Sequence, residues 1–191
     1  MSKGRLEAFS DAVVAIIMTI MVLELQVPHS TDLEALLPLW PVFASYVLSF
    51  VNLGIYWNNH HHLLQAATVV DGRVLWANLH LLFWLSLVPF GTAWMGENGI
   101  APVPTAIYGV ILLLAAVAYF LLVRALIGAR DQHAGLAEAV GRDRKGIVSA
   151  LIYVVAIPVA LVAPLIAFGL LVAVAAIWVV PDPRMERALG R

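Results

Sequence analysis

Residues 146–181 form a run of 36 positions without a charged side chain. As one α-helix this run would be about 54 Å long, which is too long for a single crossing of a bilayer core of roughly 30 Å. Pro158 and Pro164 lie inside the run, and proline is disfavoured in a helix interior because it lacks the backbone N–H. We therefore expect two membrane-spanning helices here, over residues 146–161 and 164–180, joined as a hairpin.

Four other apolar runs are long enough to cross a membrane, over residues 5–25, 36–58, 73–96 and 104–127. Each supplies roughly 20 mostly apolar residues, which is what a bilayer core demands. Hydrophobic residues make up 62% of the chain and charged residues 12%, so a soluble domain of this length could not hide the apolar surface. The sequence predicts an all-α polytopic membrane protein, a single domain over residues 1–191 with six transmembrane helices.

The positions of the 11 Lys and Arg residues test this number of crossings. Six crossings place every one of them on the same side of the membrane, whereas five would strand the three C-terminal arginines on the other side. The loops that face the opposite side, residues 29–34 and 96–104, hold acidic residues but no Lys or Arg. Because Lys and Arg accumulate on the cytoplasmic side, we expect a multi-pass protein of the cell membrane with both termini in the cytoplasm. Residues 129–145 then form a polar cytoplasmic linker that is partly helical.

Composition and motifs argue against several functions. A net charge of −1 lacks the basic face that a nucleic-acid-binding protein needs, and a chain without Cys has neither disulfides nor thiolate metal sites. His60, His61 and His62 point about 100° apart on a helix and cannot converge on one metal ion. We instead expect this cluster to hydrogen-bond the first span. Neither a GxSxG motif nor a pair of catalytic acids occurs, so the sequence predicts no enzyme, no metal site and no cofactor.

The first span carries an acidic residue near each end. Asp11 and Glu24 would lie about 20 Å apart along a helix, which is shorter than a hydrocarbon core of roughly 30 Å. At least one carboxylate would therefore enter the core, where facing lipid costs a few kcal/mol. We expect this helix to lie at the centre of an assembly, screened by the other five spans.

Helical phase divides the first span into two faces. At about 100° per residue, one face holds Phe9, Ala12, Ile16, Thr19, Ile20 and Leu23. Ser10 and Asp11 lie more than about 90° away from Ile16 around the same helix. We therefore expect Ser10 and Asp11 to point into neighbouring helices and to form a structural polar network there. The candidate partners are Arg5, Asn58, His61, His62, Asn78 and His80.

With Arg5, Phe9, Ser10 and Asp11, the stretch RLEAFSDAVVAIIMTIMVLEL resembles the RxxxFSD first helix of the lysosomal potassium-channel family, transmembrane protein 175. The stretches YWNNHHHL in the second span and NLHLLFWLSLVPFGT in the third resemble the same family. The resemblance implies a homotetramer whose four first helices line a potassium-permeable pore. It also implies that the pore lacks a carbonyl filter of the TVGYG type, and no such sequence occurs here.

The same resemblance implies roles for individual residues of the first span. Ile16, five positions after the aspartate, would form the pore constriction, and Leu23 would form a further hydrophobic ring. We also assign Ile20 to the constriction, because helical phase places it on the same face. Thr19 corresponds to a hydroxyl layer associated with potassium preference. We also expect Glu7 and Glu24 to ring the two pore mouths and to raise the local cation concentration. The predicted function is a leak-type potassium-permeable cation channel.

Other interpretations of the same residues stay open. Aliphatic residues such as Ile16 are usually packing residues, and a mid-helix Thr19 commonly donates to a preceding carbonyl, here that of Ala15. His80 lies inside the third span, either as a neutral imidazole bonded to a carbonyl or to Asp11, or as a proton-sensing group. The alternative functions are a proton-permeable channel and a secondary transporter, although a transporter typically shows inverted repeats and broken helices.

Overall fold

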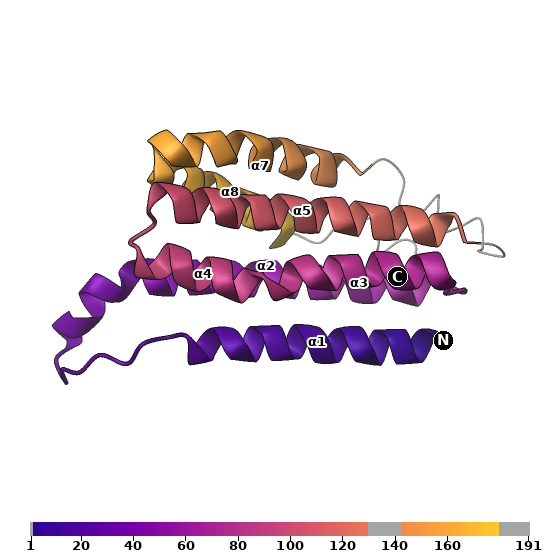
Figure 1. Ribbon diagram of the computed structural model, residues 1–191, viewed down its shortest axis with the longest axis horizontal. Helices are drawn as coiled ribbons and strands as arrows, with labels where there is room; N and C mark the ends of the chain where they lie inside the picture. The colour runs from indigo at the N-terminus through magenta and orange to yellow at the C-terminus, as the bar shows by residue number, and fades with distance from the viewer. Residues whose placement is uncertain (1, 130–142, 180–191) are drawn as a thin grey trace.

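The computed structural model describes residues 2–129 and 143–179, and the regular elements in these ranges are all helices. They are α1 (Lys3–Leu23), the short 3₁₀ helix η1 (Leu33–Leu39), α2 (Trp40–Ala66), α3 (Gly72–Ser86), α4 (Val88–Glu97), α5 (Pro102–Ile127), α7 (Arg144–Val162) and α8 (Pro164–Val179). The long helices run side by side as a bundle, with α1 along one edge (Figure 1). Most of the expected polar linker, residues 130–142, lies outside the described residues.

Within the described ranges, five helical stretches are long and apolar enough to cross a membrane: α1, η1 with α2, α3 with α4, α5, and α7. A sixth apolar stretch, α8, has 16 residues and is therefore about 24 Å long, somewhat short of a roughly 30 Å core. The fold is the all-α polytopic one that the apolar runs predict.

Prolines shape two junctions in this bundle. α3 ends at Ser86, and α4 begins at Val88 with Pro89 in its first turn. In the charge-free run of residues 146–181, Ala163 separates α7 from α8 with φ −146° and ψ 71°. This residue leaves the helical region because the ring of the following Pro164 disfavours it there. Pro158 lies inside α7 without ending it.

The core lies around α5, which packs against α3, α4, α7 and α8. Small residues bring these helices together, namely Ala115, Ala118, Ala156, Ala160 and Ala167, all of them buried. Small side chains let helix backbones approach closely, which is the main source of packing energy between helices in lipid. α1 instead packs against α2, α3 and α4.

A buried hydroxyl cluster also links α2, α4 and α5. The Oγ atom of Ser49 lies 2.6 Å from Oγ1 of Thr92 and 2.8 Å from the hydroxyl oxygen of Tyr108. Thr92 in turn donates to the carbonyl of Val88 at 2.7 Å. These hydrogen bonds are needed because the lipid core offers polar groups no hydrogen-bond partners.

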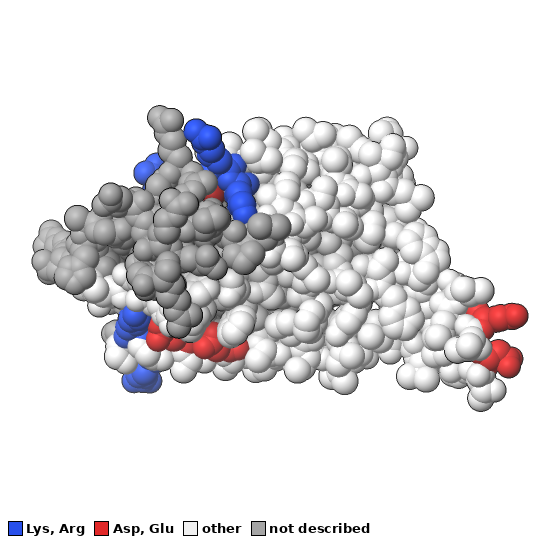
Figure 2. Space-filling model, turned by 180° about the vertical axis from the view of Figure 1, so that it is seen from behind, with Lys and Arg blue, Asp and Glu red and all other residues white. Residues whose placement is uncertain are grey.

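Charged side chains are separated toward the two ends of the bundle. The Lys and Arg residues among those described lie at the end where α1, α3 and α7 begin and α5 ends: Lys3, Arg5, Arg73, Arg124, Arg144 and Lys145. Figure 2 shows them at one end only of the drawn face, together with some acidic side chains, and a broad uncharged surface separates this end from the acidic side chains of the opposite end. The remaining arginines lie outside the described residues. We refer to the end with Lys and Arg as the basic end.

Candidate functional site: the first helix and the polar cluster behind it

One face of α1 is buried against the rest of the bundle. Its members are Leu6, Ser10, Val14, Ile17 and Met21, which recur at the three- and four-residue spacing of one helical face. Ser10 is the polar member of this face, and only 1% of it is exposed. Its hydroxyl donates to the carbonyl of Leu6 at 2.9 Å, so the oxygen keeps acceptor capacity for a second partner.

That partner is an amide on α3. Nδ2 of Asn78 donates to Oγ of Ser10 at 2.9 Å, and Oδ1 of Asn78 lies 2.7 Å from Nε2 of His60 on α2. An amide oxygen only accepts, so the imidazole is the donor in the second bond. All three side chains are buried. This chain of bonds joins α1, α3 and α2, and each such interhelical bond contributes about 0.6–1.7 kcal/mol in a membrane protein.

Asp11 is held by a tryptophan on α2. Nε1 of Trp57 donates to Oδ1 of Asp11 at 2.9 Å, and the Trp57 ring stacks on His61 with the ring centroids 6.0 Å apart. The carboxylate therefore lies beside α2, on a different side of α1 from Ile16. We refer to Ser10, Asp11, Trp57, His60 and Asn78 as the anchor cluster.

The other predicted members of the polar network are placed differently. Nδ1 of His62 is buried and has no hydrogen-bond partner among the described residues. His80 lies on the exposed side of α3, where it accepts a hydrogen bond from Nε1 of Trp84 at 2.9 Å instead of meeting Asp11. Arg5 is exposed at the start of α1. The structure thus brings Ser10 and Asn78 together but leaves Arg5 and His80 apart from them.

The face of α1 opposite to Ser10 is exposed along its length. Phe9 is 47% exposed, Ile16 57%, Ile20 40% and Leu23 80%, and Ala12 and Thr19 on the same face are also exposed. We refer to Phe9, Ala12, Ile16, Thr19, Ile20 and Leu23 as the open face. These are the residues that helical phase places on one face of the first span, and within a single chain they are exposed.

Thr19 supplies the polar group on the open face. Its hydroxyl donates to the carbonyl of Ile16 at 2.9 Å, three residues back, rather than to that of Ala15. A hydroxyl that has given its proton to the backbone still offers oxygen lone pairs. Thr19 can therefore present an acceptor to a cation in front of this face.

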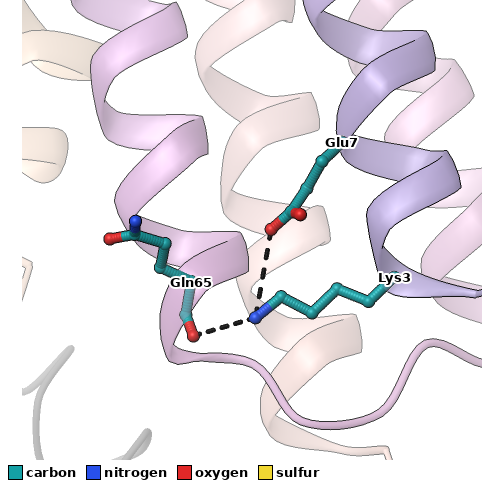
Figure 3. Close-up of polar contacts among 3 residues, drawn as sticks. All are labelled: Lys3, Glu7 and Gln65. Carbon is teal, nitrogen blue, oxygen red and sulfur yellow. Dashed lines mark hydrogen bonds and ion pairs between the residues drawn. The ribbon is translucent and has the colours of Figure 1, made fainter.

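Acidic residues lie at both ends of α1. At the basic end, Nζ of Lys3 lies 3.9 Å from Oε1 of Glu7 and donates to the backbone carbonyl of Gln65 at 3.0 Å (Figure 3). The ion pair lies within α1, and the hydrogen bond to Gln65 links the start of α1 to the end of α2. At the other end, Glu24 is exposed and lines a small pocket together with Glu97 of α4.

Sequence reasoning did not assign Trp57. It expected the cluster of His60, His61 and His62 to hydrogen-bond the first span, but it named only His61 and His62 among the candidate partners of Ser10 and Asp11. The buried positions of α2 include Asn52, Leu53, His60, Leu63 and Leu64, which recur at helical spacing. Phase applied to α2, as it was to the first span, would have identified His60. For Trp57 the available signal was its indole N–H, which needs a partner within a membrane.

Comparisons with known proteins identify related sequences. The family model described as "Endosomal/lysosomal potassium channel TMEM175" matches residues 5–89, which include the whole anchor cluster. A potassium channel of Chryseobacterium sp. (strain P1-3) is 49% identical over 189 residues, covering 99% of this chain and 98% of that protein. The endosomal/lysosomal proton channel TMEM175 of Homo sapiens is 37% identical over 75 residues, covering 33% of this chain and 15% of that protein.

The fold leads to the same group. A crystal structure of a lysosomal potassium-selective channel TMEM175 homolog from Chamaesiphon minutus is similar with a TM-score of 0.79 at 30% identity, covering 93% of this chain and 96% of that one. The similarity thus extends beyond the motifs of the first three spans to the helices that follow them. This chain, an all-helical polytopic membrane protein, belongs to the TMEM175 family, a family of ion channels and not of enzymes.

Proposed function

We propose that this chain forms a leak-type potassium channel in which α1 lines a central pore. The observation that carries the proposal is the division of α1, which is bonded to the bundle through Ser10 and Asp11 while its open face has little cover. Bacterial relatives named as potassium channels support potassium as the permeant ion. The chain needs no cofactor for this function.

The pore requires several copies of the chain, because one helix cannot enclose a hole. α1 lies along an edge of the bundle (Figure 1), and its open face points away from the helices that hold it. In the proposed homotetramer, four open faces meet around a shared axis and leave contact with lipid. The other helices then surround the four α1 helices and face the bilayer.

Ile16 is the proposed constriction. Four isoleucine side chains around the axis form an apolar ring, and such a ring blocks ions by excluding water rather than by filling the hole. Ile20 and Leu23 extend the apolar lining toward the acidic end. The pore opens when the α1 helices tilt or rotate enough for the ring to become wet.

Thr19 is the proposed potassium-selective layer. With its proton committed to the carbonyl of Ile16, each hydroxyl turns oxygen lone pairs toward the axis. Four such oxygens replace part of the hydration shell of a cation, which is how pore linings select ions in general. The channel thus works without a carbonyl filter of the TVGYG type.

The proposed orientation places the basic end and both termini in the cytoplasm, because the described Lys and Arg residues are all at that end. α8 then makes the sixth crossing. Glu7 lies at the inner mouth, where Lys3 at 3.9 Å offsets part of its charge. Glu24 lies at the outer mouth, near Glu97, and so contributes more to the local cation concentration.

Replacement of the constriction tests the pore. Ile16→Asn places a polar ring on the axis, and we expect potassium flux into proteoliposomes to rise about tenfold, which requires only about 1.4 kcal/mol less barrier. The matched control is Val154→Asn on α7, an exposed position that faces lipid in this arrangement. Equal flux in both variants would contradict the assignment of Ile16.

Replacement of the hydroxyl tests selectivity. Thr19→Val keeps the shape of the side chain and removes the oxygen, so we expect the preference for potassium over sodium to weaken. Thr19→Ser keeps the oxygen and should retain the preference. Bi-ionic current measurements on the two variants decide the point, and an unchanged preference in Thr19→Val would remove Thr19 from the selective layer.

Proton passage is the second candidate function, because animal relatives are named as proton channels. A pH-sensitive dye enclosed in the same vesicles measures proton flux alongside potassium flux. Single-channel recordings separate a channel from a secondary transporter, since a carrier does not produce discrete current steps. Proton flux without potassium flux would replace the potassium proposal with this one.

A further inference from the structure

A cavity of about 470 Å³ lies between α2, α5, α7 and α8, on the part of the bundle that does not include α1. It reaches from Arg124 and Asp143 at the basic end to Asn52 and Tyr153 further inside. The ten residue steps from Asp143, just before α7, to Tyr153 within it correspond to about 15 Å, roughly half of a bilayer core. A volume of this size is typical of a ligand site.

The cavity is open toward the flank of the bundle between α5 and α7. Three of its lining side chains, Val117, Phe120 and Ile147, are among the exposed apolar residues. In the proposed tetramer this flank faces the bilayer and meets acyl chains. Molecules of the bilayer therefore have direct access to the cavity.

The interior of the cavity carries polar groups that need partners. The hydroxyls of Tyr56 and Tyr153 line it and form no hydrogen bond to another residue among those described. Tyr153 is only 3% exposed. An unpaired hydroxyl in hydrocarbon costs several kcal/mol, so the occupant of this space must contain hydrogen-bonding atoms.

The rim of the cavity at the basic end carries a cation. The guanidinium of Arg124 lies 5.2 Å from the centre of the Phe120 ring, and Arg124 has no ion-pair partner in the described part of the chain. The nearby carboxylate of Asp143 accepts a hydrogen bond from the backbone N–H of Gly146 at 2.8 Å and so caps α7. Arg144 and Lys145 begin α7 at the same end and add positive charge.

We propose that this cavity binds the headgroup of an anionic phospholipid from the leaflet at the basic end. The phosphate lies against Arg124, the glycerol and ester oxygens accept from the hydroxyls of Tyr56 and Tyr153, and the acyl chains leave over Val117 and Phe120. Arginine suits phosphate because its donors form a planar fork. The choice of an anionic lipid rests on the orientation given under the proposed function, which places the basic end in the cytoplasm. Anionic lipids in the cytoplasmic leaflet attract basic groups near the membrane surface.

Native mass spectrometry of the full-length protein in detergent tests the proposal. The probes are dioleoylphosphatidylglycerol and dioleoylphosphatidylcholine at equal concentration, which share their acyl chains and differ in net charge. We expect the wild-type protein to bind the anionic lipid more tightly. Arg124→Gln should weaken that binding about tenfold, and Ala150→Phe, which fills the cavity from α7, should abolish it.

Two matched controls keep the test specific. Arg73→Gln removes a cation at the same end that does not line the cavity, and Leu151→Phe adds the same ring at an exposed neighbour of Ala150; both should bind as the wild type does. If Ala150→Phe fails to fold, Tyr153→Phe replaces it, since it removes only the hydroxyl.

Several outcomes would overturn the proposal. They are equal binding of the two lipids, unchanged binding in Arg124→Gln, or an equal loss in Arg73→Gln. Each of these results would mean that Arg124 in this cavity does not select an anionic headgroup. Because lipid binding is read without ion flux, none of these results bears on the channel function.

Discussion

α1 and α8 are both apolar helices of one bundle, but they are attached to it by different means. α1 is held by side-chain hydrogen bonds, from Asn78 to Ser10 and from Trp57 to Asp11. α8 buries Ala167, Leu171, Val174 and Ala175, and the side-chain bond between Trp178 and Ser149 at 2.8 Å is near its end.

The difference teaches how a helix acquires a defined rotation in lipid. Apolar burial gives little preference there, because acyl chains are as apolar as leucine, so packing and polar bonds decide. Small residues let α8 approach α7, whereas directional bonds set which side of α1 faces the bundle. Because these bonds fix the rotation of α1 about its axis, they also determine that the open face with Ile16 points away from the bundle.

The largest effect is expected from Asn78→Leu. This change removes both bonds of Asn78. It leaves His60 without its partner in the interior and Ser10 bonded only to the carbonyl of Leu6, so the free energy of unfolding should fall by about 3 kcal/mol. Because α1 loses its fixed rotation, potassium flux should change as well. Equilibrium unfolding in mixed micelles measures stability, with the exposed Asn58→Leu as the control. Equal stability of the two variants would contradict the role of the anchor cluster.

Overpacking the α7–α8 side should be somewhat milder. Ala160→Leu inserts a larger side chain at a fully buried position of α7, and it should lower the free energy of unfolding by about 1–3 kcal/mol. Potassium flux per folded protein should stay the same, because α1 keeps its anchors. The exposed Leu161→Ala serves as the control. A flux change in Ala160→Leu as large as that in Asn78→Leu would erase the distinction between the two regions.

A smaller effect separates two serines with similar roles. Ser10→Ala and Ser149→Ala each remove one acceptor, from Asn78 and from Trp178 respectively, and each should cost about 1 kcal/mol of unfolding free energy. We expect only Ser10→Ala to alter potassium flux in proteoliposomes. Altered flux in both variants would mean that rotation of α1 does not depend on its own bonds.

The smallest effect is expected at the end of α1. Lys3→Gln removes an ion pair with Glu7 that is 3.9 Å long and about one-third exposed, so the unfolding free energy should change by less than about 0.5 kcal/mol. The same measurement in mixed micelles checks it. A loss as large as that in Ser10→Ala would show that the end contacts, and not the anchor cluster, hold α1.

Part of the site could be predicted from the sequence and part could not. Helical phase separated Ser10 from Ile16, and the structure buries the first and exposes the second. The hydrogen-bond partners of Asp11 and His80 were not predicted, because Asp11 accepts from Trp57 and His80 accepts from Trp84. Phase says which residues of one helix share a face, but it does not say which neighbouring helix lies in front of that face.

The sequence by itself determined an all-helical membrane protein and the division of its first helix. Both follow from local regularities, namely the length of apolar runs and the angle of about 100° between successive residues. Only the tertiary structure decided that His60, rather than its two neighbours, joins Asn78 and that α2, α5, α7 and α8 enclose a cavity. Those features depend on the distance and rotation between helices, which side-chain packing sets across the whole bundle and no single segment encodes.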